Sequence, residues 1–355
     1  MTPIVSRSPF GRLPTGEAVE LFEMHSSTGM VVRVCGYGGV IQGIEVPDRR
    51  GRVGDVVLGY DRLDQYVADS GYFGALIGRY ANRIREGRFR LDGREYRLPV
   101  NDGPHHLHGG PGGFHKVCWH VQPFGGEETV GLRLRRVSPD GEQGYPGRLD
   151  AEVTYTVDGN DLVVDYFART DRPTPVCLTQ HTYFNLGAQA GHDVLEHRLQ
   201  LAAARYTPVD DGLIPTGELA PVEGTPFDFR APAEIGERIA ADDPQLARAA
   251  GYDHNFVLER EGGEPVLAAR AHDPGSGRVL EVWTTEPGLQ FYSGNYLDGT
   301  VRGKEGRRYE HHTGFCLEPQ RFPDSPNHPE FPSCILRPGE HYRSRTIYRF
   351  GVDEA

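Results

Sequence analysis

The sequence predicts an all-β protein built as a large antiparallel sandwich or barrel, and three observations support this fold class. Short segments of alternating apolar and polar residues recur along the chain, with turn residues between them. Glycine and proline are frequent, with 46 and 27 copies in 355 residues, and they do not gather in low-complexity tracts. No alternation of strands and helices recurs, which argues against a parallel α/β sheet.

The clearest alternating segments form three predicted hairpins. The first turns at Asp92-Gly93, a pair that favours the type I′ turn. The second turns at residues 158–160, which read Asp-Gly-Asn, and the third at residues 274–277, which read Pro-Gly-Ser-Gly. Each turn is flanked by aromatic and β-branched residues at every second position, as expected for strands with one buried face.

Helical patterning is confined to two regions. Leu63, Tyr66 and Val67 have the spacing of one short helix. Residues 233–250 predict one or two more, with a break expected at residues 242–244, which read Asp-Asp-Pro.

The chain contains no internal repeat and no linker, and it is long enough to bury a large core. We therefore expect one domain over residues 1–355. Residues 1–15 are polar and contain proline, so we leave them as a mobile tail or an interface arm. The sequence does not distinguish a monomer from a homodimer.

Composition argues against several classes of partner. The chain has 38 basic and 50 acidic residues, a net charge of -12 that repels nucleic acid. No apolar run of about 18 residues is present to span a membrane, and the first residues lack the apolar segment of a signal peptide. The five cysteines form no Cys-x-x-Cys pair, which is typical of reduced thiols in a cytoplasmic protein.

Two residues are candidates for proton transfer. His181 lies near Gln180 and Tyr183, whose polar groups suit a polyol, and an imidazole exchanges protons readily near neutral pH. Glu318 follows an apolar stretch that resembles a buried strand, where desolvation would raise the carboxyl pKa into the range of a general base. Considered alone, His181 is better explained as a buried structural histidine, and Glu318 suits a partner for an arginine equally well.

Other polar residues are candidates for sugar binding. Asn82 and Arg83 offer a fork of donors for hydroxyls, although a structural salt bridge is the commoner role of an arginine. Asp253 stands beside aromatic residues, as sugar-binding carboxylates often do, although an aspartate can also cap a turn. Gly109 and Gly110 permit a close approach of two backbone segments or a turn with positive φ.

The histidines also raise the alternative of a metal site. His106 and His108 alternate, so on a strand both would face one side. A metal site needs three or more converging ligands, and glycines and a proline follow this pair instead of a glutamate. We therefore expect no metal and no other cofactor.

Six segments, in order along the chain, resemble the aldose 1-epimerase family, the galactose mutarotases. The resemblance implies a large antiparallel β-sandwich of the galactose mutarotase type. It also implies interconversion of the α and β anomers of free aldoses such as galactose and glucose, by acid/base ring opening and reclosure. The segments are residues 78–84 (G-R-Y-A-N-R-I), 107–110 (L-H-G-G), 181–186 (H-T-Y-F-N-L), 251–256 (G-Y-D-H-N-F), 286–295 (E-P-G-L-Q-F-Y-S-G-N) and 316–320 (C-L-E-P-Q).

The resemblance implies roles for individual residues. His181 corresponds to the general acid and Glu318 to the general base. Two departures from the family pattern are Pro319, where threonine is common, and Tyr80, where valine is common. The residues expected to bind the sugar are Asn82, Arg83, His108, Tyr183, Asp253 and Gln290.

Three alternatives belong to other functional classes. A sugar-binding protein without catalytic activity would not need both His181 and Glu318. A glycosidase would use two carboxylates, here Asp253 and Glu318, and would leave His181 without a role. An epimerase for phosphorylated hexoses would need several basic residues at its site, and Arg83 is the one that the sequence nominates.

Overall fold

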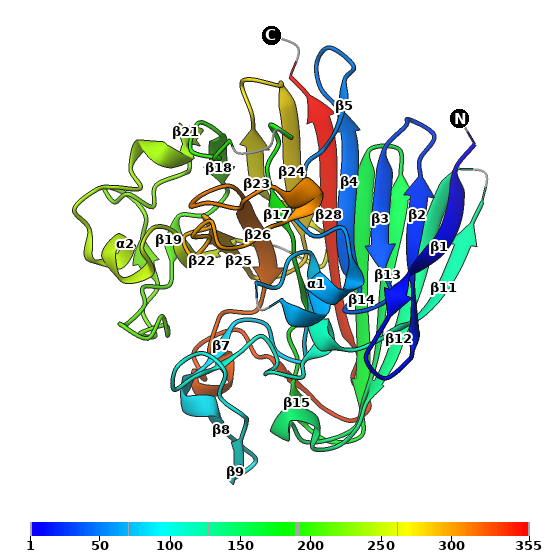
Figure 1. The fold of residues 1–355 in the computed structure, drawn as a ribbon. Helices are drawn as coiled ribbons and strands as arrows, with labels where there is room; N and C mark the ends of the chain where they lie inside the picture. The colour runs from blue at the N-terminus through cyan, green and yellow to red at the C-terminus, as the bar shows by residue number, and fades with distance from the viewer. Residues whose placement is uncertain (1, 70, 127, 189–191, 261, 354–355) are drawn as a thin grey trace.

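A computed structural model describes residues 2–69, 71–126, 128–188, 192–260 and 262–353, which form mainly antiparallel strands (Figure 1). This confirms the predicted all-β class, and three large sheets make up most of the molecule. The largest has nine strands, in the spatial order β11 (His120–Gly125), β12 (Thr129–Ser138), β13 (Leu149–Asp158), β14 (Asp161–Thr170), β28 (Tyr342–Val352), β24 (Arg278–Thr284), β23 (Val266–His272), β18 (Arg198–Leu201) and β21 (Ala233–Glu234).

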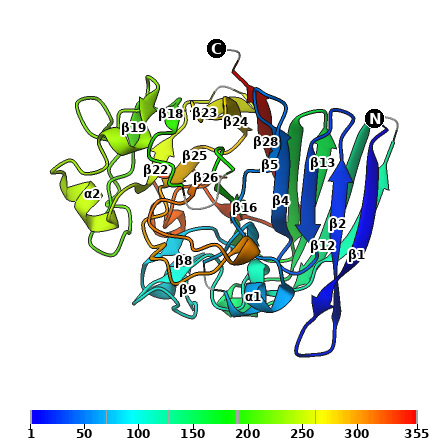
Figure 2. The ribbon, with the colours of Figure 1, turned by 45° about the horizontal axis from the view of Figure 1, so that its top comes forward.

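Two further sheets pack beside this one. Figures 1 and 2 show the five-stranded sheet alongside β11–β14 and the six-stranded sheet beside β23 and β24. The five-stranded sheet runs β1 (Ile4–Arg12), β2 (Ala18–His25), β3 (Val31–Cys35), β4 (Val40–Pro47) and β5 (Val53–Asp55). The six-stranded sheet runs β17 (Tyr183–Phe184), β26 (Phe315–Gln320), β25 (Gly288–Tyr292), β22 (Asp253–Val257), β19 (Arg205–Tyr206) and β20 (Ala220–Pro221).

Short elements complete the described fold. Four two-stranded sheets pair β6 (Ala75–Ile77) with β16 (Thr179–His181), β7 (Arg83–Ile84) with β10 (His106–Leu107), β8 (Arg88–Leu91) with β9 (Arg94–Arg97), and β15 (Thr174–Pro175) with β27 (Ile335–Leu336). The helices are α1 (Leu63–Ala68), α2 (Pro244–Ala249) and the 3-10 turns η1 (Arg85–Gly87), η2 (Phe114–Lys116), η3 (Glu142–Gly144), η4 (Ile235–Glu237), η5 (Lys304–Gly306) and η6 (Ser325–Asn327).

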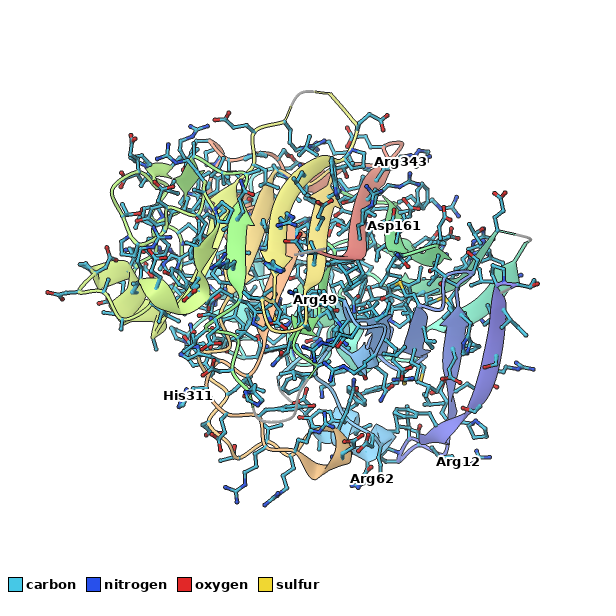
Figure 3. The ribbon with its side chains drawn as sticks, turned by 90° about the horizontal axis from the view of Figure 1, so that it is seen from above. Arg12, Arg49, Arg62, Asp161, His311 and Arg343 are labelled. Carbon is cyan, nitrogen blue, oxygen red and sulfur yellow. The ribbon has the colours of Figure 1, made fainter. Side chains whose placement is uncertain are left out.

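The core forms where the sheets meet. Along strand β13 every second residue is buried, and the residues between them are partly buried or exposed, as a period of two requires when one face lies against the core. One apolar cluster takes Val32 from the five-stranded sheet, Val153 from the nine-stranded sheet and Phe291 from the six-stranded sheet. The charged side chains of Arg12 and Arg62 lie at the edge of the molecule (Figure 3).

All three predicted hairpins are present, as the pairs β8–β9, β13–β14 and β23–β24. At the first, Asp92 and Gly93 have φ values of 49° and 80°. Two positive φ angles in a two-residue loop are what a type I′ turn requires, and an Asp-Gly pair accepts them at low cost.

The helix predictions are correct in part. Helix α1 forms where expected, with Leu63 and Tyr66 buried. Residues 233–250 form two helical elements, η4 and α2, and Asp242 and Asp243 lie in the non-helical stretch between them, as predicted. Pro244 is instead the first residue of α2, and the side chain of Asp243 caps this helix by accepting hydrogen bonds from the backbone N–H groups of Gln245 and Leu246.

The N-terminal stretch and the helices bear on two further expectations. Residues 4–12 form β1, an edge strand that pairs with β2 along its length. They lie within residues 1–15, for which we expected a mobile tail or an interface arm. Helices α1 and α2 have six residues each, and among the described residues no helix has the length and apolar character needed to cross a membrane.

Candidate active site

A pocket of about 680 Å³ brings together seven of the eight residues that the sequence nominates. They come from segments far apart in the chain, and the six-stranded sheet and the paired strands β6–β16 and β7–β10 converge on them. The seven are Asn82, Arg83, His108, His181, Tyr183, Asp253 and Glu318.

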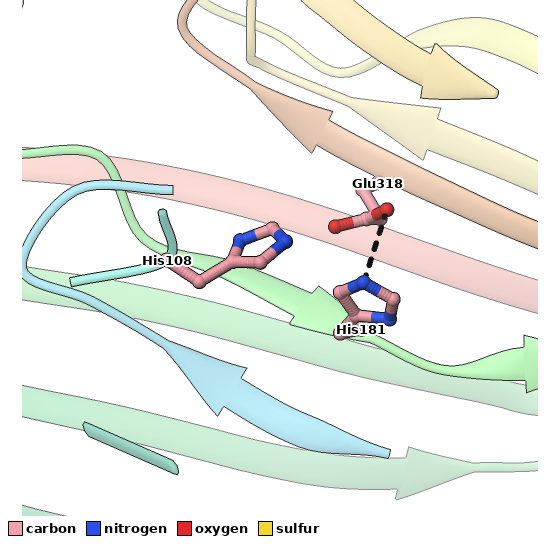
Figure 4. A group of neighbouring side chains, drawn as sticks. All are labelled: His108, His181 and Glu318. Atoms are coloured by element: carbon pink, nitrogen blue, oxygen red, sulfur yellow. Dashed lines mark ion pairs between the residues drawn. The ribbon is translucent and has the colours of Figure 1, made fainter. Parts of the chain in front are cut away.

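The centre of the pocket is a histidine–glutamate pair. Nε2 of His181, at the end of β16, lies 3.7 Å from Oε1 of Glu318 on β26 (Figure 4). The two residues are 5% and 2% exposed. This separation is longer than a hydrogen bond, so a proton can be relayed between the two residues through a bound hydroxyl that contacts both, with bulk water largely excluded.

Burial favours the uncharged form of each partner. It raises the pKa of Glu318 well above its usual value, with Asp253 adding to the effect, and it lowers the pKa of His181 to about 4. The two shifts favour a proton on the Glu318 carboxyl over one on the His181 imidazole. A carboxylate whose pKa is raised is a stronger base, and an imidazolium whose pKa is lowered is a stronger acid, which suits the removal of one proton and the supply of another.

The ring of His181 is fixed between two tyrosines. It stacks on Tyr72, with ring centroids 5.6 Å apart, and on Tyr183, at 5.1 Å. The hydroxyl of Tyr183 donates to the carbonyl of Gly71, at 2.9 Å, which in turn holds the tyrosine. The imidazole is therefore held in one plane, as a group that transfers protons needs to be.

His108 enters the pocket with a defined tautomer. Its Nδ1 accepts the backbone N–H of Asn82 at 3.2 Å, so the neutral ring carries its proton on Nε2 and can donate it to a ligand oxygen. The backbone here turns tightly, because a Cβ on Gly109 would lie 1.9 Å from the carbonyl oxygen of Gly78. The predicted close approach at Gly109 is therefore present.

Arg83 connects two carboxylates in the pocket wall. Its Nε donates to Asp102 at 2.7 Å, and its Nη1 lies 3.8 Å from Oδ2 of Asp253. The other oxygen of Asp253 accepts the amide N–H of Gln290 at 2.8 Å. Gln290 is thus the one nominated residue outside the pocket lining, where it orients Asp253.

His106 and His108, the pair considered as metal ligands, have different surroundings. The ring nitrogens of His106 contact the carbonyl of Pro99 at 2.6 Å and the hydroxyl of Tyr145 at 2.7 Å, which is a structural role. Ring or carboxylate atoms of His108, His181 and Glu318 do lie within 4.8 Å of one another, close enough to contact a single ion. The expectation of a metal-free site therefore stays a prediction.

Three further pocket residues carry no signal in the sequence. Tyr72 contacts the rings of both His108 and His181, and it belongs to no motif. Asp102 holds Arg83 from a turn that reads Asn-Asp-Gly. Tyr296 is 57% exposed and stacks on Tyr292 at the pocket, with ring centroids 5.9 Å apart.

Fold and site together define a class: an antiparallel β-sandwich enzyme with a buried acid–base pair in a polar, aromatic pocket. The sequence profile of the family described as aldose 1-epimerase matches residues 20–349, and the chain belongs to this family.

Individual relatives match along nearly their whole length. The chain is 50% identical to "Galactose mutarotase" of Rattus norvegicus, covering 98% of this chain and 99% of that protein. It is 41% identical to "Aldose 1-epimerase" of Escherichia coli (strain K12), covering 95% and 96%. The crystal structure of galactose 1-epimerase from Lactobacillus acidophilus NCFM superposes with a TM-score of 0.88 at 27% identity, covering 99% and 100%.

Proposed function

We propose that the protein interconverts the α and β anomers of free aldoses such as galactose and glucose, with Glu318 as general base and His181 as general acid. The observation that carries the proposal is the 3.7 Å approach of His181 Nε2 to Glu318 Oε1 inside a buried pocket. Mutarotation needs one proton removed and one supplied, and this pair can do both without leaving the pocket.

The reaction conserves one proton on the pair. Glu318 removes the proton from the C1 hydroxyl while His181 donates one to the ring oxygen, and the C1–O5 bond breaks to give an open-chain aldehyde. Rotation about C1–C2 exposes the other face of the carbonyl. Closure reverses both transfers, so the carboxylate and the imidazolium are restored together.

The electrostatics of the pair favour the ring-opening step. With a closed sugar the pair must be carboxylate and imidazolium, whereas with the open-chain aldehyde both groups are neutral. Burial disfavours the charged forms, as the raised pKa of Glu318 and the lowered pKa of His181 indicate. The pocket therefore stabilises the open-chain complex, which compensates for the lower stability of the free aldehyde.

The remaining polar groups suit the sugar hydroxyls. His108 and Arg83 offer donors, Asp253 offers an acceptor, and Asn82 and Tyr183 line the same pocket. The binding roles of these residues, and the supporting role of Gln290 behind Asp253, are part of the proposal.

The compartment and the partners of the protein are also part of the proposal. All five cysteines are free thiols, which suits a cytoplasmic protein. We propose that the protein acts on a small-molecule sugar, as a monomer or a homodimer, without nucleic acid, membrane or cofactor.

The test is polarimetry of freshly dissolved α-galactose and α-glucose at neutral pH, with and without excess chelator. We expect a faster decay to the same final rotation, unchanged by the chelator. No acceleration with any common aldose would contradict the proposal and favour a binding protein. Release of nitrophenol from aryl glycosides would favour a glycosidase, and loss of activity with the chelator would show that a metal takes part.

A further inference from the structure

Strand β26 contacts both nitrogens of the His181 ring. Residues 316 and 318 lie two apart on the strand and so face the same side. Glu318 lies near Nε2, and the sulfur of Cys316 lies 3.6 Å from Nδ1. Cys316 is fully buried, at 0% exposure, so its sulfur has no contact with solvent.

We propose that Cys316 is a positioning residue that keeps the proton of His181 on Nδ1, so that Nε2 alone exchanges a proton with the substrate. The inference rests on the proposed function, because it assigns the tautomer that the general acid needs. Nothing in the contacts of Cys316 requires it to touch the sugar.

The chemistry requires this tautomer. When the imidazolium gives its Nε2 proton to the ring oxygen, the neutral ring that remains must carry its proton on Nδ1. Only then is Nε2 free to take a proton back on closure. Nδ1 therefore needs an acceptor in every step, and the Cys316 sulfur is in place to be one.

A sulfur acceptor differs from the carboxylate that often holds this position. Burial keeps the Cys316 thiol neutral by raising its pKa well above the usual value. A neutral sulfur that accepts the Nδ1 proton favours this tautomer and adds little stabilisation to the imidazolium. A carboxylate would hold the proton more tightly and slow its transfer to the ring oxygen.

The second histidine of the pocket has the opposite arrangement. Nδ1 of His108 accepts a backbone N–H, so His108 is an Nε2 donor that suits binding. In His181, Nδ1 lies against a thiol sulfur, which under this proposal accepts the Nδ1 proton and leaves Nε2 free for proton transfer. The two rings, with centroids 5.0 Å apart, are thus assigned different tasks by their Nδ1 partners.

The experiment is ¹⁵N NMR of the His181 ring in the substrate-free protein, together with the kinetics of galactose mutarotation. In the wild-type protein we expect the Nδ1–H tautomer. Cys316→Ala should shift the ring toward a mixture with Nε2–H and lower kcat by about tenfold or more, with little change in KM, because the loss of a partner behind a functional histidine typically costs about 10–100-fold.

Two variants separate positioning from packing. Cys35→Ala deletes the same group from the same apolar cluster, away from His181, and should keep the wild-type kcat and tautomer. Cys316→Ser returns an acceptor and should recover Nδ1–H and part of the rate.

The Nε2–H tautomer in the wild-type protein would overturn the inference. So would a wild-type kcat in Cys316→Ala, or an equal loss in Cys35→Ala. The tautomer is read without turnover, so failure of this inference is distinguishable from failure of the proposed function, which an inactive wild-type protein would show.

Discussion

The guanidinium of Arg83 contacts Asp102 through Nε and approaches Asp253 through Nη1. A lysine ammonium is a point charge on a flexible stem and cannot reproduce this fork. We expect Arg83→Lys to lower kcat/KM about 10–100-fold, the equivalent of one charged hydrogen bond worth about 1.5–3 kcal/mol. Steady-state polarimetry with galactose measures the change.

Arg345→Lys is the matched control for this variant. Arg345 also forms a fork, with Asp165, but on the half-exposed face of the nine-stranded sheet. Its replacement should leave kcat/KM unchanged, because exposed ion pairs contribute little and this one is not at the pocket. An Arg83→Lys variant as active as Arg345→Lys would show that the fork does not hold the sugar or Asp253.

At the residue scale, sequence predicted the site where chemistry and motif coincide. The residues nominated to transfer a proton or to bind the sugar stand in the family segments, and the structure brings seven of the eight to one pocket. Tyr72 was not nominated from the sequence, because its position in the pocket depends on a loop conformation with φ of 60°, which no sequence pattern encodes. Gln290 lies outside the lining because its orientation depends on Asp253, a partner on the neighbouring strand.

At the element scale, three neighbouring strands carry three of the nominated side chains, Glu318, Gln290 and Asp253. The order β26-β25-β22 places Glu318 opposite Gln290, and Gln290 opposite Asn255, close to Asp253. The hairpins were predictable because their turns are local in sequence. The pairing of β17 with β26 was not, because it joins residues 183 and 316, whose contact depends on the whole fold.

The loop that carries His108 leaves no room for a side chain at Gly109. Gly109 has φ of +81°, and a Cβ there would lie 1.9 Å from the Gly78 carbonyl oxygen. We expect Gly109→Ala to displace His108, to lower kcat/KM, and to destabilise the fold by more than about 3 kcal/mol, because strain and overlap add. Urea unfolding followed by circular dichroism measures the loss.

Gly93→Ala is the control, since Gly93 has φ of +80° and a Cβ there would meet nothing within 4 Å. It should cost only the strain of the left-handed backbone, about 1–2 kcal/mol, and leave activity intact. Equal losses of stability in the two variants would mean that the crowding at Gly109 is relieved by small movements.

At the scale of the whole molecule, buried histidines predict how stability depends on pH. Burial lowers the pKa of eight histidines below the ordinary 6.5, including His105 and His272, and six of them shift most strongly and are neutral in the folded protein. These are His106, His181 and His197, lowered to about 4, His115 and His254, lowered to about 3, and His108, lowered well below its usual value.

Between pH 6.5 and about 4 the unfolded chain binds protons at these histidines that the folded chain does not. The free energy of unfolding must therefore fall as the pH is lowered through this window. Asp253 and Glu318, which are buried, and Asp69, which is partly buried, act in the opposite direction, because their raised pKa values let the folded protein bind protons there. They are fewer, so we expect a net loss of at least about 1.4 kcal/mol per pH unit near pH 5.

Thermal unfolding by calorimetry at several pH values between 4 and 7 measures this slope. His197→Gln removes one of the six groups, at a site where Nε2 accepts the backbone N–H of Leu186, and should reduce the slope. A slope of zero or of opposite sign would contradict the neutral assignment. One domain over residues 1–355 stays a prediction, and a single cooperative transition in the same scans would support it.

The most direct test of the central claim is the galactose mutarotation rate of Glu318→Gln, His181→Asn and the double variant, measured by polarimetry. If the two residues pass one proton as a unit, each single variant loses at least about 10² in kcat, and the double variant loses little more than the worse single one. A near wild-type rate in either single variant, or losses that multiply in the double variant, would contradict the shared-proton pair.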